Sequence, residues 1–235
     1  DGFQSELSYI VGPKLFEMDR NTLTAKGRLE ECVCVRVDCP LPRSFVDAYE
    51  SLDPRLRSPN EEETGWQRTK TQQERLYNFN PTKYKILRRI LDVHRGKQIL
   101  IFGDAIDPLR AFRDQLQIDG ANHYLIMGSA GRSSKKTMTE SQGVVLAAGS
   151  PSARQQMKRF RKREITTLFF SRVGDQGMDL PNATVLVQLS YLKGSRRQEV
   201  QRIGRLARVS TAGPAYFYSL VTPNTQEPGY YRKRM

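Results

Sequence analysis

The sequence predicts an α/β domain whose mostly parallel sheet is covered by helices on both faces. Two observations support this fold class. Short apolar runs such as QILIFG, TTLFF and VLVQL recur along the chain, and such runs are typical of strands buried on both faces. Amphipathic helical patterns separate them, and this alternation gives parallel strands joined by right-handed crossovers. A chain of 235 residues with 38% hydrophobic content can bury one good core.

Residues 1–53 are predicted to form an arm that precedes the sheet domain. A short helix is expected at Asn21–Lys26, where Gly27 would end it. In ECVCVRVD the valines alternate with other residues, which predicts a half-buried strand. A helix should then run over Ser44–Leu52, with Ser44 as its N-cap.

Two segments outside the sheet domain carry no apolar periodicity. Residues 54–71 are polar and contain prolines, which predicts a flexible surface loop. The sheet domain itself is predicted over 72–222. The tail, 223–235, is rich in Pro and Gly and ends in a basic run with no core pattern. We therefore expect Arg234→Ala to be almost silent.

Inside the sheet domain, strand and helix patterns alternate. Asn80 should cap a helix that Pro81 opens, and Asp107 with Pro108 repeats this arrangement before a second helix. Apolar residues at helical spacing mark the buried faces of these two helices: Tyr84, Leu87 and Leu91 in the first, Leu109, Phe112 and Leu116 in the second. A third helix is expected from Ser150 and Pro151 to about Arg161. The strand candidates are QILIFG, HYLIM, VVLAA, TTLFF, VLVQL and YFYSLV.

The charge balance predicts a polyanionic partner. The chain has 38 Lys+Arg against 25 Asp+Glu, a formal net charge of +13. Nucleic acid and an anionic membrane both fit this surplus. No apolar run approaches the ~20 residues that a membrane-spanning helix needs, and no apolar leader lies near the start, so nucleic acid is the simpler partner. The sequence lacks a ladder of aromatic residues for base stacking, which favours contacts to phosphates that are insensitive to base sequence.

The cysteines do not indicate a metal site. Cys32, Cys34 and Cys39 are close together, but they form no CxxC pair and His94 and His123 are distant in sequence. We expect no metal ligands here. An odd number of thiols without a disulfide framework points to a reducing compartment.

The last third of the chain contains two segments with functional character, SRVGDQGMDLP (Ser171–Pro181) and SRRQEVQRIGRLAR (Ser195–Arg208). In a helix through the second segment, one stripe would carry an amide and two guanidiniums, from Gln201, Arg205 and Arg208. The opposite stripe would be apolar, with Val200, Ile203 and Ala207. Guanidinium groups fork onto phosphate oxygens, so this front should face a phosphate.

These segments resemble motifs V and VI of superfamily-two helicases. The residues around both motifs are most similar to those of the XPB family of DNA helicases and translocases. Further similar lines are GPKLFE, NFNPTKY, ILIFGDA and YFYSLV, in the order of the family. The resemblance covers most of the chain. It implies that the sheet domain is a RecA-like lobe, the second of the two in the motor.

The resemblance also implies roles for individual residues. Ser171 would contact a nucleic-acid phosphate, Gly177 would allow a close backbone approach, and Asp179 would accept a hydrogen bond from the ribose of ATP. Arg205 and Arg208 would be arginine fingers, with Gln201 beside them. On residues alone, Asp179 could instead cap a turn, and the arginines could be a solvated basic face, although Gly204 within that helix costs ~1 kcal/mol and favours close packing.

Three further arginines are candidate nucleic-acid contacts: Arg172 beside Ser171, and Arg196 with Arg197 at the start of motif VI. The basic run at 158–163 could touch a DNA backbone, serve in nuclear import, or be a solvated helix end. The family has one strand where this chain offers HYLIM and VVLAA, so residues 128–143 between them look like an insertion.

No phosphate loop of the GxxxxGK[ST] type and no DEAD-like acidic tetrad occurs in the sequence. We therefore expect a second lobe from a longer protein, inactive as an ATPase by itself and not binding nucleotide tightly. ATP and Mg²⁺ would bind in the intact protein, between this lobe and the missing N-terminal RecA-like lobe. The resemblance further implies DNA and TFIIH-like subunits as partners, a nuclear location, and a role in repair and transcription initiation. The alternative is a non-enzymatic DNA-binding or scaffold module, which a Walker A lysine upstream would exclude.

Overall fold

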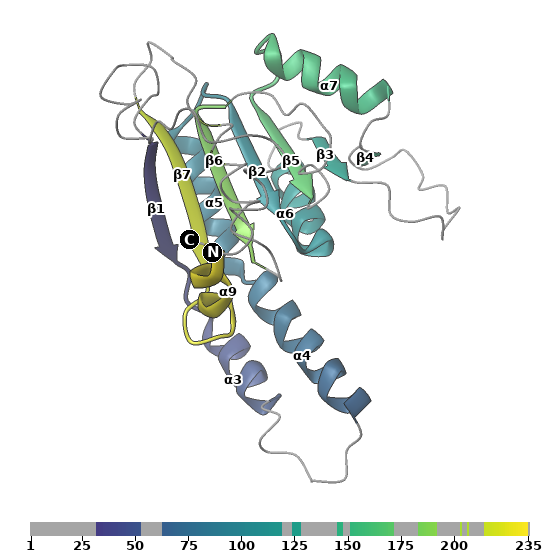
Figure 1. The fold of residues 1–235 in the computed structure, drawn as a ribbon, viewed down its shortest axis with the longest axis vertical. Helices are drawn as coiled ribbons and strands as arrows, with labels where there is room; N and C mark the ends of the chain where they lie inside the picture. Colours follow the sequence, from purple (N-terminus) through teal and green to yellow (C-terminus); the bar gives the residue numbers. More distant parts are fainter. Residues whose placement is uncertain are drawn as a thin grey trace, which may run out of the picture.

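A seven-stranded sheet forms the centre of the molecule (Figure 1). The computed structural model describes residues 32–52, 63–118, 124–127, 145–147, 151–171, 183–191, 203, 206 and 214–234. Every strand pairing among them is parallel, in the order β1-β7-β6-β2-β5-β3-β4. The strands are β1 (Cys32–Asp38), β2 (Ile99–Gly103), β3 (Tyr124–Met127), β4 (Val145–Ala147), β5 (Thr167–Ser171), β6 (Val185–Ser190) and β7 (Ala215–Val221). The predicted parallel α/β architecture is confirmed.

Helices α5 (Pro81–Val93) and α6 (Ile106–Ile118) cover one face of the sheet. Their predicted apolar faces pack against the strand residues that point to this face of the sheet, such as Ile99 and Ile101. Leu87, Leu109 and Phe112 are buried in this layer. The Asn80 side chain accepts the N–H of Thr82 at 3.0 Å, so the predicted cap of α5 is confirmed. Asp107 lies inside the first turn of α6 instead of capping it, because the helix already begins at Ile106.

Helix α7 (Pro151–Arg161) covers the other face. Ala153, Met157 and Phe160 pack there against Leu100 and Phe102, the residues of β2 that alternate with those on the first face. The two faces together give two apolar layers around one sheet. Helices therefore lie on both faces, as predicted.

The segment predicted as an arm contributes the edge strand of this sheet. Its strand β1 is half-buried, as its alternating pattern predicts, and it pairs along its whole length with β7. The next helix, α3 (Arg43–Ser51), starts one residue earlier than predicted, since the carbonyl of Pro42 accepts the N–H groups of Phe45 and Val46 at 2.8 and 3.0 Å. Ser44 is therefore inside α3, and no side chain caps this helix. The helix predicted at 21–26 lies outside the described residues.

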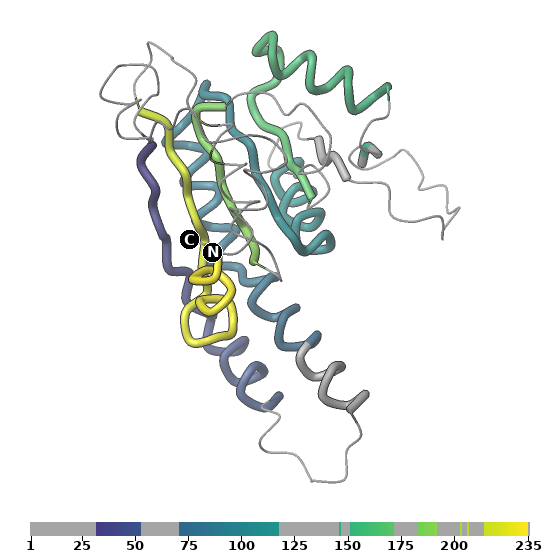
Figure 2. The backbone as a smooth tube through the Cα atoms, in the orientation of Figure 1, coloured from purple at the N-terminus to yellow at the C-terminus, as the bar shows by residue number. Residues whose placement is uncertain are grey.

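Helix α4 (Glu63–Asn78) occupies much of the segment predicted as a loop. The loop prediction for 54–71 is wrong from Glu63 onward. In the second half of α4, Gln73 donates to the carbonyl of Leu52 at 3.2 Å, which fixes it against α3. Extending a helix that is already fixed costs little, because each added residue gains one backbone hydrogen bond. This extension accommodates Gly65 and the absence of an apolar period in the first half of α4. Figure 2 shows α3 and the second half of α4 side by side, away from the sheet.

The tail also folds, as helix α9 (Glu227–Arg234). Its first and last residues, Glu227 and Arg234, are buried at 0% and 1% exposure. The expectation of a tail without core contacts is therefore wrong. Glu227 and Arg234 are buried because each meets an opposite charge from the sheet domain, Lys83 and Asp104 respectively, so no apolar pattern was needed.

Both HYLIM and VVLAA form strands of the sheet, β3 and β4, which pair with each other. The insertion predicted at 128–143 between them lies outside the described residues.

Candidate functional site

The carboxyl ends of β2, β5 and β6 meet at one edge of the sheet. Gly103 at the end of β2 is in register with Ser171 of β5 and Ser190 of β6. In open α/β sheets, ligands bind at this edge. Ser171, predicted to contact a nucleic-acid phosphate, therefore lies on a central strand at the expected edge, with 1% of its surface exposed.

Ser190 connects the end of β6 to the loop that follows β2. Its Oγ accepts the N–H groups of Asp104 and Ala105 at 2.9 and 3.2 Å. Gly103 allows this close approach, because a Cβ at that position would lie 2.9 Å from Leu109 Cδ1 and 3.4 Å from Ser190 Oγ. The backbone beside Ser171 is thus held in one arrangement.

A fully buried ion pair lies behind this edge. Lys83 Nζ of α5 donates to both carboxylate oxygens of Glu227 at 2.6 and 2.7 Å, and to the carbonyl of Leu189 at 2.8 Å. Glu227 also accepts the N–H of Thr222 at 2.7 Å and that of Tyr191 at 3.3 Å. Burial raises the pKa of Glu227, and the charge of Lys83 with these hydrogen bonds opposes that rise.

A second buried ion pair joins Arg234, near the end of α9, to Asp104. Both side chains are fully buried, and the guanidinium of Arg234 lies over the ring of Tyr191, 5.2 Å from its centroid. Asp104 directly follows Gly103. The tail therefore contacts the same loop that Ser190 holds.

Asn80 completes the polar network at this edge. Its Nδ2 donates to the carbonyl of Cys39 at 2.7 Å and to Thr222 Oγ1 at 3.2 Å. A helix cap thus also connects the ends of β1 and β7. Cys39 itself is buried, which raises the pKa of its thiol to about 12, so it stays protonated near neutral pH.

Most of the predicted site residues lie outside the part of the chain that the structure describes: Arg172, Gly177, Asp179, Arg196, Arg197, Gln201, Arg205 and Arg208. Two residues of the motif VI segment are described. Ile203 packs against the apolar layer that α7 covers, and Leu206 is buried within that layer. The prediction that Ile203 faces the core is confirmed. Val200 and Ala207 of the same predicted stripe lie outside the described residues.

The predicted single helix through Arg208 is wrong at Leu206. This residue forms a parallel β-bridge with Ala183, just before β6, and its N–H bonds to the carbonyl of Ile203 at 2.9 Å. Gly204 disfavours a continuing helix, and Leu206 is buried at the bridge. In sequence, Arg205 lies between Ile203 and Leu206, which both pack in the apolar layer on this face of the sheet.

The buried ion pairs of the tail are the part of this edge that sequence reasoning missed. The segment NFNPTKY, which contains Lys83, indicates by itself only a similarity to the XPB family. The partner of Lys83 is Glu227, 144 positions away, and no spacing rule connects residues so far apart.

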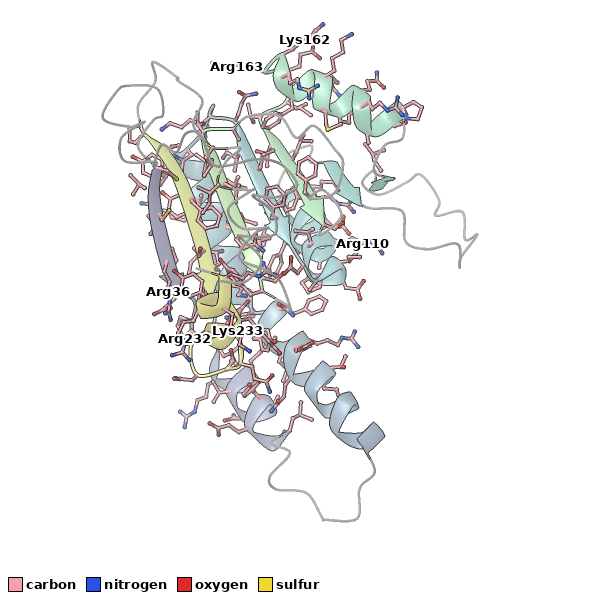
Figure 3. All side chains as sticks on the ribbon, in the orientation of Figure 1. Arg36, Arg110, Lys162, Arg163, Arg232 and Lys233 are labelled. Atoms are coloured by element: carbon pink, nitrogen blue, oxygen red, sulfur yellow. The ribbon has the colours of Figure 1, made fainter. Side chains whose placement is uncertain are left out.

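The basic run at the end of α7 lies at the opposite, amino edge of the sheet. Gln98, just before β2, donates to the carbonyl of Phe160 at 2.5 Å. Figure 3 shows Lys162 and Arg163 at this end, far from Arg232 and Lys233 of α9. Glu164 lies 3.3 Å from Arg159 and 4.0 Å from Lys162, so part of the charge is paired.

The described residues contain no group of three or more metal-binding side chains. No disulfide joins Cys32, Cys34 and Cys39. None of the described helices is long and apolar enough to span a bilayer.

Residues 23–235 match the family model described as ERCC3/RAD25/XPB C-terminal helicase. Two similar curated relatives are named general transcription and DNA repair factor IIH helicase/translocase subunit XPB. That of Encephalitozoon cuniculi is 32% identical and that of Schizosaccharomyces pombe 31%, each over 97% of this chain. The chain spans only 29% and 24% of their lengths.

Solved structures of low sequence identity share the fold. The Sulfolobus solfataricus SWI2/SNF2 ATPase core domain aligns with a TM-score of 0.58 and 14% identity, over 97% of this chain and 48% of that one. The C-terminal domain of the Sulfolobus solfataricus SWI2/SNF2 ATPase aligns at 0.54 and 12%, over 86% and 84%. These likenesses confirm the RecA-like fold that the sequence predicts.

Proposed function

Since this chain belongs to the ERCC3/RAD25/XPB C-terminal helicase family, we propose that it is the second motor lobe of an ATP-dependent DNA helicase or translocase. The family match over 23–235 is the observation that carries this proposal. The chain spans less than a third of its relatives, so the activity would belong to a longer protein with a first lobe.

We assign nucleotide contacts to the motif V and motif VI segments. Arg205 and Arg208 would contact the γ-phosphate when the lobes close, with Gln201 beside them. Asp179 would accept a ribose hydroxyl, and Gly177 would let the backbone approach. This donor set fits ATP, since guanidinium forks match phosphate oxygens and a carboxylate accepts from sugar hydroxyls. ATP with Mg²⁺ would supply the transferable phosphoryl group in the intact protein.

DNA would contact the carboxyl edge through its phosphates. Ser171 ends a central strand there, and Arg172, Arg196 and Arg197 belong to the segments that we assign to this edge. The buried network from Asp104 to Arg234 supports the proposal, because it holds the backbone next to Ser171. Phosphate contacts carry no sequence information, so binding should be insensitive to base sequence.

The named relatives are subunits of general transcription and DNA repair factor IIH. We therefore propose that the longer protein acts in the nucleus, within a TFIIH-like assembly. There it would open DNA for excision repair and for transcription initiation.

The test is Arg205→Ala in the intact two-lobed protein. Arginine fingers contribute about 10³ to 10⁵ in rate, so DNA-stimulated ATP turnover should collapse while the melting temperature and DNA affinity stay near wild type. Arg205→Lys should also be badly impaired, because a point charge replaces a planar fork. Arg232→Ala, at an exposed position of α9, is the matched control.

The 235-residue chain alone should show no turnover, because its sequence has no phosphate loop. If Arg205→Ala keeps most of the DNA-stimulated rate in the intact protein, the arginine belongs to a solvated basic face. If the intact protein lacks a Walker A lysine and any turnover, the scaffold alternative holds.

A further inference from the structure

A cavity of about 290 Å³ lies at the amino edge of the sheet, on the opposite side from Ser171. It is formed where α5 and α6 end and where β2 and β5 begin. Leu91, Ile99 and Leu116 give it an apolar floor. Arg88, Arg95 and Lys97 surround it with positive charge. None of the roles assigned to this lobe uses the cavity.

His94 adds a buried polar group to the lining of this cavity. It is 4% exposed, and its Nε2 lies 2.8 Å from the hydroxyl of Tyr218. Its Nδ1 has no hydrogen-bond partner among the described residues. Burial, assisted by the charge of Lys97, lowers the pKa of His94, so the ring is neutral near pH 7. When Nε2 accepts the hydrogen bond of the Tyr218 hydroxyl, Nδ1 carries the ring proton and is a hydrogen-bond donor.

The basic rim is held in place on one side. Lys97 Nζ lies over the ring of Tyr216, 5.4 Å from its centroid, and this ring stacks on that of Tyr218. Arg95 is 86% exposed, and its carboxylate neighbour Asp92 lies at 3.3 Å. Among the described residues that line the cavity there are three cationic side chains and one carboxylate, so this part of the rim carries more positive than negative charge. Val93, beside them in sequence, exposes 62% of an apolar side chain at the same edge.

Size and lining together select the ligand. Pockets for cofactors and drug-sized ligands are typically about 300 to 1,000 Å³, so this cavity suits one or two side chains better than a nucleotide. A free phosphate or a DNA backbone would use the rim but leave the apolar floor in water. An apolar side chain flanked by carboxylates would satisfy both.

We propose that this cavity docks an acidic peptide segment of a partner protein, with an apolar anchor on the floor of the cavity and carboxylates on its basic rim. The docked segment would lie away from the carboxyl edge. A partner could therefore hold this lobe while nucleotide and DNA contact the other edge. This inference does not depend on the function proposed above.

The probe is a fluorescein-labelled peptide in which a Leu-Phe pair is flanked on both sides by glutamates, titrated with the 235-residue chain. Arg95→Glu should weaken binding at least about tenfold, a change of 1.4 kcal/mol. This variant should fold, since Arg95 is largely exposed. Arg232→Glu makes the same charge change on α9, where the residue is also exposed, and should leave binding unchanged. A peptide with Ala-Ala in place of Leu-Phe should bind the wild-type chain as weakly as the Leu-Phe peptide binds the Arg95→Glu variant.

Four results would overturn the proposal. No saturable binding of the acidic peptide is the first. Equal weakening by Arg95→Glu and Arg232→Glu, or equal binding of the Ala-Ala peptide, would indicate general charge attraction without docking in the cavity. Competition by duplex DNA that depends on Arg95 would make this edge a nucleic-acid site instead. The proposal would be supported by saturable binding that Arg95→Glu and the Ala-Ala peptide weaken and Arg232→Glu does not, together with a shift of the NMR signals of the His94 ring nitrogens on titration.

Discussion

At the scale of single residues, the buried ion pairs near the carboxyl edge should contribute strongly to the stability of the fold. Lys83, Glu227, Asp104 and Arg234 are charged residues, yet each is buried against an opposite charge. Removing one partner of such a pair leaves a charge in a medium that solvates it poorly. The paired residues should therefore be intolerant of substitution.

Arg234→Ala tests this at the end of the chain. The change removes the guanidinium partner of a buried carboxylate, Asp104, and should lower the free energy of unfolding by about 3 to 5 kcal/mol. Urea denaturation measures it. Arg232→Ala, two residues away and exposed, should stay within about 0.5 kcal/mol of wild type. Equal stabilities would restore the expectation from the sequence that Arg234 is silent.

Lys83→Met should give a defect that depends on pH. It removes the charge that opposes the raised pKa of Glu227, so that pKa rises further. Above the unfolded value of about 4.3, the folded variant then binds more protons than the unfolded chain, and its stability falls as pH rises. We expect a loss of about 3 to 5 kcal/mol near neutral pH, and a smaller one in acid.

Urea unfolding of wild type and variant over a series of pH values checks this. The double variant Lys83→Met/Glu227→Gln removes the titrating group and should lose the added pH dependence. A defect of Lys83→Met that is the same at every pH would mean that the loss comes from packing alone.

At the scale of elements, local patterns predicted what is built locally. Strand runs and helix faces such as that of Leu109 and Phe112 were correct, because burial on a sheet imposes a period that is visible in sequence. The position of Ser171 at a strand end followed from the same pattern. Helices α4 and α9 were missed because partners distant in sequence stabilise them: Gln73 bonds to Leu52, and Arg234 meets Asp104 across 130 positions.

Gly103→Ala tests the contact between β2, α6 and β6. The new Cβ would lie 2.9 Å from Leu109 Cδ1, and crowding of this kind costs about 1 to 3 kcal/mol. Gly229→Ala in α9 is the matched control, since a Cβ there meets nothing within 4 Å and raises helix propensity by up to ~1 kcal/mol. Thermal or urea unfolding should separate the two. A Gly103→Ala protein as stable as Gly229→Ala would show that Leu109 moves aside freely.

At the scale of the whole molecule, the two edges of the sheet have different surroundings. The carboxyl edge is held by buried ion pairs. The motif V segment begins there, at Ser171 of β5. The amino edge has the cavity beside α5. Lys162 and Arg163, just after α7, lie at this edge as well (Figure 3). A net charge of +13 attracts DNA to either, so affinity alone cannot identify the edge that binds.

The dependence of DNA binding on salt can identify it. Each phosphate neutralised releases condensed counterions, so the log of the association constant should fall linearly with log salt, with a slope of about 0.9 per contact on duplex DNA. If DNA lies on the carboxyl edge, Arg196→Ala and Arg197→Ala should each reduce the slope by about 1. The pair Lys162→Ala and Arg163→Ala, at two exposed positions of the amino edge, should leave it unchanged. Anisotropy titrations with two duplexes of unrelated sequence should agree, because phosphate contacts do not read bases. A slope that responds to Lys162 and Arg163 but not to Arg196 and Arg197 would place DNA on the amino edge and contradict the assignment of Ser171.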